Sequence, residues 1–274
     1  MSDLTTLQYL VDLVDDETEE VRRQIIKELI NYGTNLEQDL HEFSEELTEA
    51  KLSILEPVLQ ENRRQWLYDN WNSWQLINDE YESLEKGIEL ISVFQDGLTE
   101  ENELATLLDS LTEEFMNKFP YGDEFDLANY LFRERNFTGA QKDYYNPRNS
   151  NLLHAIKTKH GLPITLTVLY MLVGNRAGLF IEGCNFPGHF LAKIKMDEEV
   201  IMVDCFNQGR LIYESELEKM VKESYEAVMN IVNSHTTPSS IIRRILNNLV
   251  NAYKQKGDQV NSDFFSGLIK VTTW

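Results

Sequence analysis

The chain has 274 residues, of which 42% are apolar, and a formal net charge of −21. This length and apolar content suit one large or two modest domains, each with its own hydrophobic core. A strongly acidic surface repels phosphate backbones and anionic lipids, so the composition argues against nucleic-acid and membrane partners. No apolar run reaches membrane-spanning length, and no basic segment opens the N-terminus as in a secretory signal. We therefore expect a cytoplasmic protein.

The cysteines and the charges add two further expectations. Cys184 and Cys205 are too few for a disulfide framework, so we expect free thiols in a reducing compartment. Residues 1–140 hold 33 acidic against 10 basic side chains, whereas residues 141–274 hold 13 against 15. We interpret the acidic half as a solvated helical surface. A surface for a basic partner is the alternative.

The first 135 residues are predicted to form an acidic helical region. Apolar side chains recur at helical spacing over residues 4–14 and again over residues 21–30, where Gly33 provides a helix end. This pair of short helices resembles one HEAT-type repeat unit. We assign the tryptophans near residue 70 to packing between helices, with a ligand cage as the alternative. Further helices are predicted over residues 36–47, 66–74 and 104–115.

A loop over residues 134–148 is predicted to lead into the most informative part of the chain. Ser150 is expected to cap a helix that runs to about Lys159, with Gly161 past its end. Pro163 suits the first position of the next helix, where its missing N–H costs nothing. That helix has almost no polar face before Gly178, so we expect it to be deeply buried.

Three β-type runs follow this buried helix, over residues 180–184, 189–194 and 200–204. The acidic turn at residues 197–199 predicts that the second and third runs form an antiparallel hairpin. Residues 210–212 are expected to add one more strand. The predicted fold class is therefore α+β, predominantly helical, with a buried helix against a small antiparallel sheet in a core over residues 136–214.

Helices are predicted again over residues 215–274. A capping-box signature spans residues 215–218. An amphipathic segment then runs to Gly257, and a second helix is expected over residues 259–269. This pair resembles one tetratricopeptide unit, which we interpret as a helical cap on the core.

Specific motifs in the core carry a resemblance to a known family. In order they read NPRNSNLL, HGLPITL, EGCNFPGHFLAKI and VDCFNQGRL. They resemble the SirB-type branch of the transglutaminase-like superfamily, strongly over about residues 140–212 and loosely in the flanking helices. The resemblance implies a papain-like arrangement. In it, a cysteine opens a buried helix, a histidine follows on a strand, and an aspartate lies on the next strand.

The resemblance assigns His189 to the histidine and Asp204 to the aspartate that orients it. The cysteine position falls at the start of the buried helix, where this chain has Pro163, which bears no nucleophile. Thr165 and Thr167 supply hydroxyls nearby, but neither replaces a thiol whose pKa a helix N-terminus lowers. The expected result is a degenerate site that keeps its scaffold without its nucleophile.

The two cysteines of the chain are further candidates for this site. Cys184 precedes His189 by five residues and is the candidate substitute nucleophile, although a buried hydrophobic role is the commoner fate of a free cysteine. Cys205 follows Asp204, so strand alternation directs it to the opposite face. These residues lack the paired spacing of zinc ligands, so we expect no metal and no cofactor. The remaining histidines, assigned to the surface or to caps, are His41, His154, His160 and His235.

Arg148 and Asn149 are predicted to pin the loop that borders the site. If a small anion binds, these two residues and the helix start at Pro163 are the candidate ligand-binding positions. The function we expect is a non-catalytic transglutaminase-like interaction or regulatory module with a protein partner. The alternative is a hydrolase or acyltransferase that uses His189 and Asp204 with Cys184 or with water.

Overall fold

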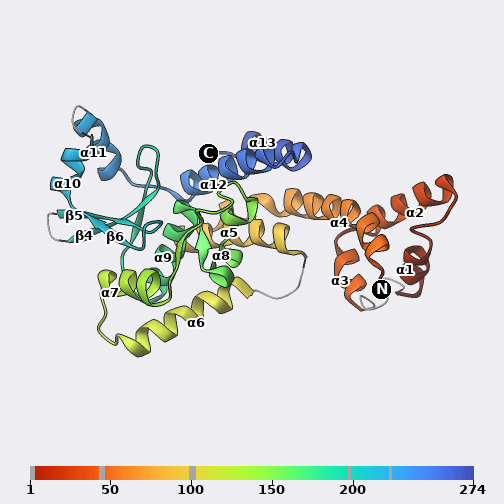
Figure 1. Cartoon of the computed structure of the whole chain (residues 1–274), viewed down its shortest axis with the longest axis horizontal. Coiled ribbons are helices and arrows are strands. Elements are labelled where there is room, and N and C mark those ends of the chain that lie inside the picture. The colour runs from red at the N-terminus through yellow and green to blue at the C-terminus, as the bar shows by residue number, and fades with distance from the viewer. Residues whose placement is uncertain (1–3, 43–46, 99–102, 197–198, 222–223) are drawn as a thin grey trace. The chain divides into compact units, whose positions relative to one another are not determined.

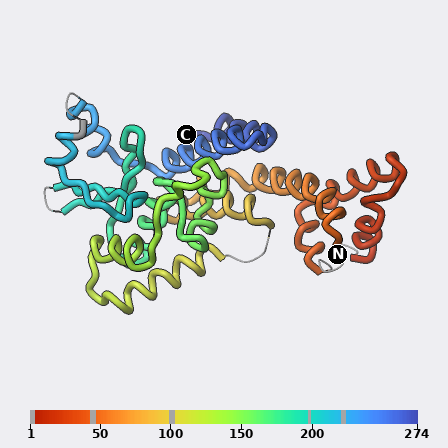
Figure 2. Tube along the Cα trace, viewed as in Figure 1, coloured from red at the N-terminus to blue at the C-terminus, as the bar shows by residue number. Residues whose placement is uncertain are grey.

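The computed structural model describes residues 4–42, 47–98, 103–196, 199–221 and 224–274. The chain divides into two compact units, one of residues 1–71 with 93–101 and one of residues 72–92 with 102–274. This division differs from the boundaries predicted after residues 135 and 214. Figures 1 and 2 trace the helices and strands of each unit along the chain.

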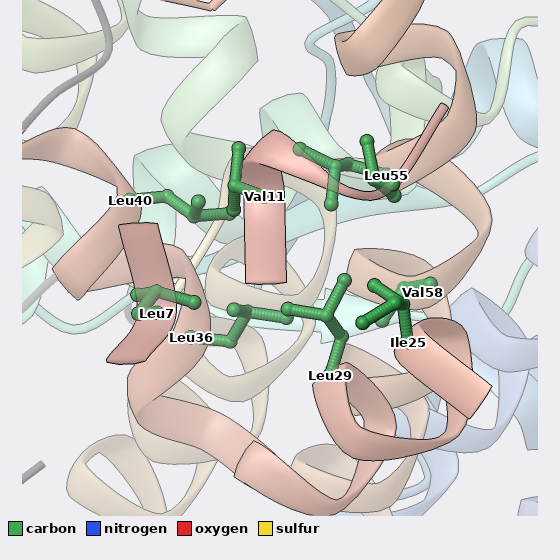
Figure 3. Packing of buried hydrophobic residues seen from close by; sticks show 9 residues of the cluster. Leu7, Val11, Ile25, Leu29, Leu36, Leu40, Leu55 and Val58 are labelled. Carbon is green, nitrogen blue, oxygen red and sulfur yellow. The ribbon is translucent and has the colours of Figure 1, made fainter. Parts of the chain in front are cut away.

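The first unit is helical and has its own core. Nine buried apolar side chains meet there, contributed by the α-helices over residues 4–12, 19–32, 36–41 and 49–70 and by the turn that carries Val14 (Figure 3). The predicted helix over residues 36–47 is shorter than expected, because α3 ends at His41, and residues 43–46 lie outside the described residues. The helices of this unit are α1 (Leu4–Asp12), α2 (Glu19–Tyr32), a 3₁₀ turn (Gly33–Asn35), α3 (Leu36–His41) and α4 (Glu49–Asn70).

Gly33 ends α2 in a backbone conformation that other residues rarely adopt, with φ of 79° and ψ of −150°. A Cβ built there meets nothing within 4 Å, so any cost of a side chain is backbone strain alone. We expect Gly33→Ala to lower the free energy of unfolding by about 1–2 kcal/mol, measured by urea denaturation. The control is Gly267→Ala in helix α13 (Gln259–Val271), which should leave stability unchanged or raise it. Equal losses in both variants would contradict this explanation.

The second unit contains the buried helix predicted from the sequence. Every residue of α9 from Pro163 to Gly174 is buried, and Pro163 occupies the first turn after Leu162. The helix packs against α6, α7 and α8 and against the sheet. The helical elements up to and including it are a 3₁₀ helix (Trp71–Leu76), α5 (Glu80–Asp96), α6 (Glu103–Lys118), α7 (Glu124–Asn129), a π-helical turn (Tyr130–Glu134), a 3₁₀ turn (Pro147–Ser150), α8 (Leu152–Thr158) and α9 (Pro163–Arg176).

One local expectation about α8 was wrong. Asn151, not Ser150, is the N-cap, because Ser150 still belongs to the preceding 3₁₀ turn. The Asn151 side chain accepts a hydrogen bond from the N–H of His154 at 2.9 Å. The helix ends as predicted at about Lys159, which adopts the left-handed conformation with a φ of 66°, and Gly161 lies past that end in a short strand.

Four strands form the antiparallel sheet in the order β3–β4–β5–β6. The predicted hairpin between the second and third runs is present as β4 and β5, although residues 197–198 of its turn lie outside the described residues. A parallel pair, β1 (Thr138–Gly139) with β2 (His160–Gly161), was not predicted and lies partly in the expected loop 134–148. The sheet strands are β3 (Glu182–Cys184), β4 (Leu191–Met196), β5 (Glu199–Asp204) and β6 (Arg210–Ile212).

Helices cover both faces of this sheet. α9 contacts β3 and β4 on one face, where a Cβ on Gly183 would meet Met171 of α9. The other face packs against Leu217 of α10 (Glu214–Val221) and Val228 of α11 (Tyr225–Asn233). The chain ends in α12 (Pro238–Gln255) and α13, which pack along each other (Figure 1).

The fold class is therefore a predominantly helical α+β protein, as predicted. None of the helices in the described part of the chain combines the length and the apolar content needed to cross a bilayer.

Candidate functional site

His189 and Asp204 meet beside the four-stranded sheet. His189 lies just before β4 and follows Gly188, whose φ of 72° turns the chain. Asp204 is the last residue of β5. His189 Nε2 lies 2.9 Å from Asp204 Oδ1. The His189 N–H donates to the carbonyl oxygen of Phe186 at 3.1 Å, which fixes the turn that presents the imidazole.

The surroundings of Asp204 determine how the imidazole is held. Burial alone would raise the pKa of Asp204, but hydrogen bonds from His189 and Asn207 outweigh burial and lower the pKa below its ordinary value. Asn207 donates its backbone N–H to Oδ1 at 3.2 Å and its amide to Oδ2 at 2.8 Å. The carboxylate is ionised near neutral pH and only accepts, so the neutral His189 ring carries its proton on Nε2.

The second ring nitrogen of His189 is consequently a basic atom. No hydrogen bond joins Nδ1 to any residue in the described ranges. The side chain is 26% exposed, so solvent or a ligand reaches the ring. An oriented imidazole with a free lone pair is able to accept a proton or a hydrogen bond.

We expect nitrogen NMR to show the Nε2–H tautomer of His189 as the dominant neutral form. Asp204→Asn replaces an obligatory acceptor with a group that also donates, so the preference for this tautomer should weaken. The His160 ring, whose Nδ1 contacts the Thr158 carbonyl oxygen, serves as an internal control because its signal should not change. An unchanged tautomer ratio at His189 in Asp204→Asn would contradict this assignment.

Aromatic rings line one side of the histidine. The ring centroids of His189 and Phe206 are 6.1 Å apart with the planes at 87°, and those of Phe206 and Tyr144 are 6.2 Å apart. A Cβ on Gly139 would lie 2.5 Å from the Phe206 ring, so strand β1 approaches this closely only because that position is glycine. The histidine therefore has an apolar neighbour on a loop and a second aromatic ring behind it.

Asn149 links this aromatic group to the start of α9. Its amide donates to the carbonyl oxygens of Asp143 and Tyr144 at 2.9 and 3.1 Å. The backbone carbonyl oxygen of Asn149 accepts a hydrogen bond from the Thr165 hydroxyl at 2.9 Å. Both amide hydrogens are thus used inside the protein, which favours the structural role over ligand binding. Arg148 is exposed and donates Nε to His154 Nδ1 at 3.4 Å.

The helix start that faces this loop has no nucleophile. Pro163 is buried at the first turn of α9. The Thr165 hydroxyl is engaged with Asn149, and Thr167 is fully buried at 0% exposure. Neither hydroxyl is placed to act in the manner of a helix-activated thiol.

Both native thiols lie inside the core. Cys184 is 0% exposed and packs with Phe186, Leu191 and Met202 on the sheet face that α10 and α11 cover. Burial raises its pKa to about 11. Cys205 is also 0% exposed, and burial raises its pKa to about 12. Thiols that stay protonated and inaccessible are poor nucleophiles.

A metal centre is not indicated by the geometry. Among the described residues, no three His, Cys, Asp or Glu side chains are grouped so that they could hold an ion.

One group near the sheet was not predicted. His235, expected at the surface or at a cap, bridges two carboxylates, with Nδ1 at 3.1 Å from Glu182 and Nε2 at 3.0 Å from Glu80. The three side chains border a cavity of about 50 Å³ next to Tyr81. Sequence reasoning missed this group because its members are far apart in the chain, and no local motif joins them.

The carboxylates of Glu80 and Glu182 raise the pKa of His235. A raised folded-state pKa gives stability that is full below the ordinary histidine value of 6.5 and is lost as pH rises through the folded value. We therefore expect His235→Gln to destabilise the protein more at pH 6 than at pH 9, measured by urea denaturation. Equal destabilisation at both pH values would contradict a charged His235.

The fold and the site together define a class. A buried helix rests against an antiparallel sheet, and the sheet presents a hydrogen-bonded His189–Asp204 pair beside the loop that leads to the helix start. This is the arrangement expected of a transglutaminase-like domain.

Comparison with known proteins supports this class. The family model described as transglutaminase-like superfamily matches residues 99–247. A UPF0162 protein of Xylella fastidiosa strain 9a5c is 31% identical over 203 residues, which cover 69% of this chain and 71% of that protein. A second UPF0162 protein, from strain Temecula1, is 35% identical over 133 residues, covering 45% of this chain and 46% of that protein. The chain belongs to the transglutaminase-like superfamily.

A further relative is a protein of which the matched segment forms only a small part. F-box only protein 21 of Mus musculus is 28% identical over 142 residues, which cover 48% of this chain and 22% of that protein. No solved structure matches the chain significantly.

Proposed function

We propose that this protein is a non-catalytic transglutaminase-like module of the SirB-type branch, which acts in the cytoplasm through a protein partner. The observation that carries the proposal is that no accessible thiol lies where the family has its cysteine. Pro163 opens the buried helix, while Cys184 and Cys205 are both 0% exposed. A Cys–His–Asp site without an accessible thiol cannot form an acyl-enzyme, and loss of the nucleophile removes most of the rate enhancement.

Two further observations support an interaction role. Asp204 still orients the His189 ring, and Asn207 still holds the Asp204 carboxylate, although the helix start bears no nucleophile. A related segment also occurs within a relative of which it forms only 22%, as expected of a module that is joined to other regions. The helices on either side, which resemble HEAT and tetratricopeptide units, belong to types that commonly form binding surfaces.

A turnover assay tests this proposal. The full chain is incubated with glutamine-containing peptides and a primary amine, and products of transamidation or hydrolysis are followed by mass spectrometry. We expect no product above the level seen with His189→Ala. Time-dependent product that disappears in His189→Ala would overturn the proposal.

One observation favours a second candidate, a hydrolase that uses water instead of a thiol. The Nδ1 atom of His189 has no hydrogen-bond partner among the described residues, and Asp204 orients the ring, as a general base requires. The test is hydrolysis of p-nitrophenyl acetate with wild type and Asp204→Asn. Hydrolysis by the wild type without an initial burst of product, at a rate that falls at least about tenfold in Asp204→Asn, would favour the hydrolase.

A further inference from the structure

Arg244 of α12 lies against the segment that carries His189. Its guanidinium carbon is 5.3 Å from the centroid of the Phe190 ring, and Nη1 donates a hydrogen bond to Asn185 Oδ1. Asn185 and Phe190 bracket the turn in which His189 lies. Tyr144, whose ring contacts Phe206 next to the histidine, also lies close enough to Arg244 to influence its pKa. The guanidinium is therefore part of the surroundings of the site, although α12 lies far away in sequence.

The charge of Arg244 is not balanced by a carboxylate of the described residues. Burial lowers its pKa, and the two groups that oppose this shift, Tyr144 and Cys184, are uncharged near neutral pH because burial raises their own pKa values. Within the described ranges, no Asp or Glu oxygen forms an ion pair with it. Two other half-buried arginines are paired with carboxylates: Arg63 with Glu37, and Arg176 with Glu85 and Asp109. In a chain with a net charge of −21, an arginine without a carboxylate leaves a position that suits an external anion.

We propose that Arg244 is the recognition residue of the His189 site and that it binds the carboxylate of a peptide. This deepens the proposed interaction function and rests on it. A guanidinium presents parallel N–H donors that match a carboxylate. Oδ1 of Asn185 is used by Arg244, so the Asn185 amide nitrogen remains as a further donor for the same ligand. The Phe206 and Tyr144 rings supply an apolar neighbour for a side chain beside the carboxylate.

The experiment uses the ¹⁵N-labelled full chain and four short peptides followed by NMR. Acetyl-Phe-Gly with a free C-terminus is compared with its C-terminal amide, and acetyl-Phe-Asp-amide is compared with acetyl-Phe-Asn-amide. We expect one or both acidic peptides to shift the His189 and Asn185 signals saturably. The acidic peptide that binds shows whether a C-terminal or a side-chain carboxylate is recognised. Equal binding of neutral and acidic peptides, or no shift from any of them, would overturn the proposal.

Two variants test whether the peptide carboxylate binds at Arg244. Arg244→Gln should weaken binding at least about tenfold, because it removes a charged hydrogen-bonding group. Arg243→Gln is the matched control, since Arg243 is exposed on the same helix and its guanidinium lies over the Trp274 ring. This control should bind normally.

Asn185→Ala changes an exposed residue and covers the case in which Arg244→Gln fails to fold. It should also weaken binding of the acidic peptide. Equal weakening by Arg243→Gln and Arg244→Gln, or unchanged affinity in Asn185→Ala, would place the carboxylate elsewhere and overturn the assignment. The proposed lack of catalysis is judged separately, because the turnover assay does not depend on these peptides.

Discussion

Lys193→Met is expected to lower the free energy of unfolding by about 3–5 kcal/mol, because it breaks a buried ionic group. The Lys193 side chain is 1% exposed, and its Nζ donates to the carbonyl oxygens of Val232 and Ser234 at 3.1 and 2.7 Å. Glu182 Oε2 lies 3.6 Å from the same atom. Methionine fills similar volume but leaves these acceptors unpaired at the junction between the sheet and the end of α11. Urea denaturation measures the loss.

Lys195→Met is the matched control for this prediction. Lys195 is also close to Glu182, at 3.4 Å, but its side chain is 54% exposed. Exposed ion pairs contribute little, so the control should lose less than about 1 kcal/mol. If both variants lose the same stability, burial of Lys193 is not the source of the effect.

Pro163→Cys is expected to give a thiol that reacts with iodoacetamide at least about 100-fold faster than the two native thiols. The position lies at the start of α9, where the helix dipole favours a thiolate, and a histidine completes the ion pair if the ancestral geometry persists. Intact-mass spectrometry follows the labelling over time. Val271→Cys, at an exposed helix end, provides a reference for an ordinary accessible thiol.

A second variant decides whether His189 activates the introduced thiol. Combining Pro163→Cys with His189→Ala should slow labelling without exposing Cys184 or Cys205. Labelling of Pro163→Cys that is unaffected by His189→Ala would show that the helix start and the imidazole do not form a common site.

Regular elements were largely predictable from sequence periodicity. The apolar run after Pro163 correctly predicted the buried helix, and the alternating runs predicted the strands of the antiparallel sheet. Helix α5 was not predicted. It contains Gly87, which has low helix propensity, and a Cβ there would lie 2.5 Å from Ile242 of α12. Packing between distant helices, which local propensity does not encode, explains this omission.

The site was predictable only in part. The motifs around His189 and Asp204 indicated two residues that the structure places 2.9 Å apart. Cys184 was considered because it is near His189 in sequence, but its strand position directs the thiol into the core beneath α10 and α11. Tyr144 and Arg244 depend on contacts between distant segments, so no local pattern could have identified them.

The most direct test of the central claim is the pH dependence of thiol alkylation in the native protein. We predict that Cys184 and Cys205 react slowly with iodoacetamide, that the rates still rise with pH above neutrality because burial raises the two thiol pKa values to about 11 and about 12, and that His189→Ala changes neither rate. A thiol whose rate is already maximal near neutral pH, and which loses that reactivity in His189→Ala, would contradict the absence of a nucleophile.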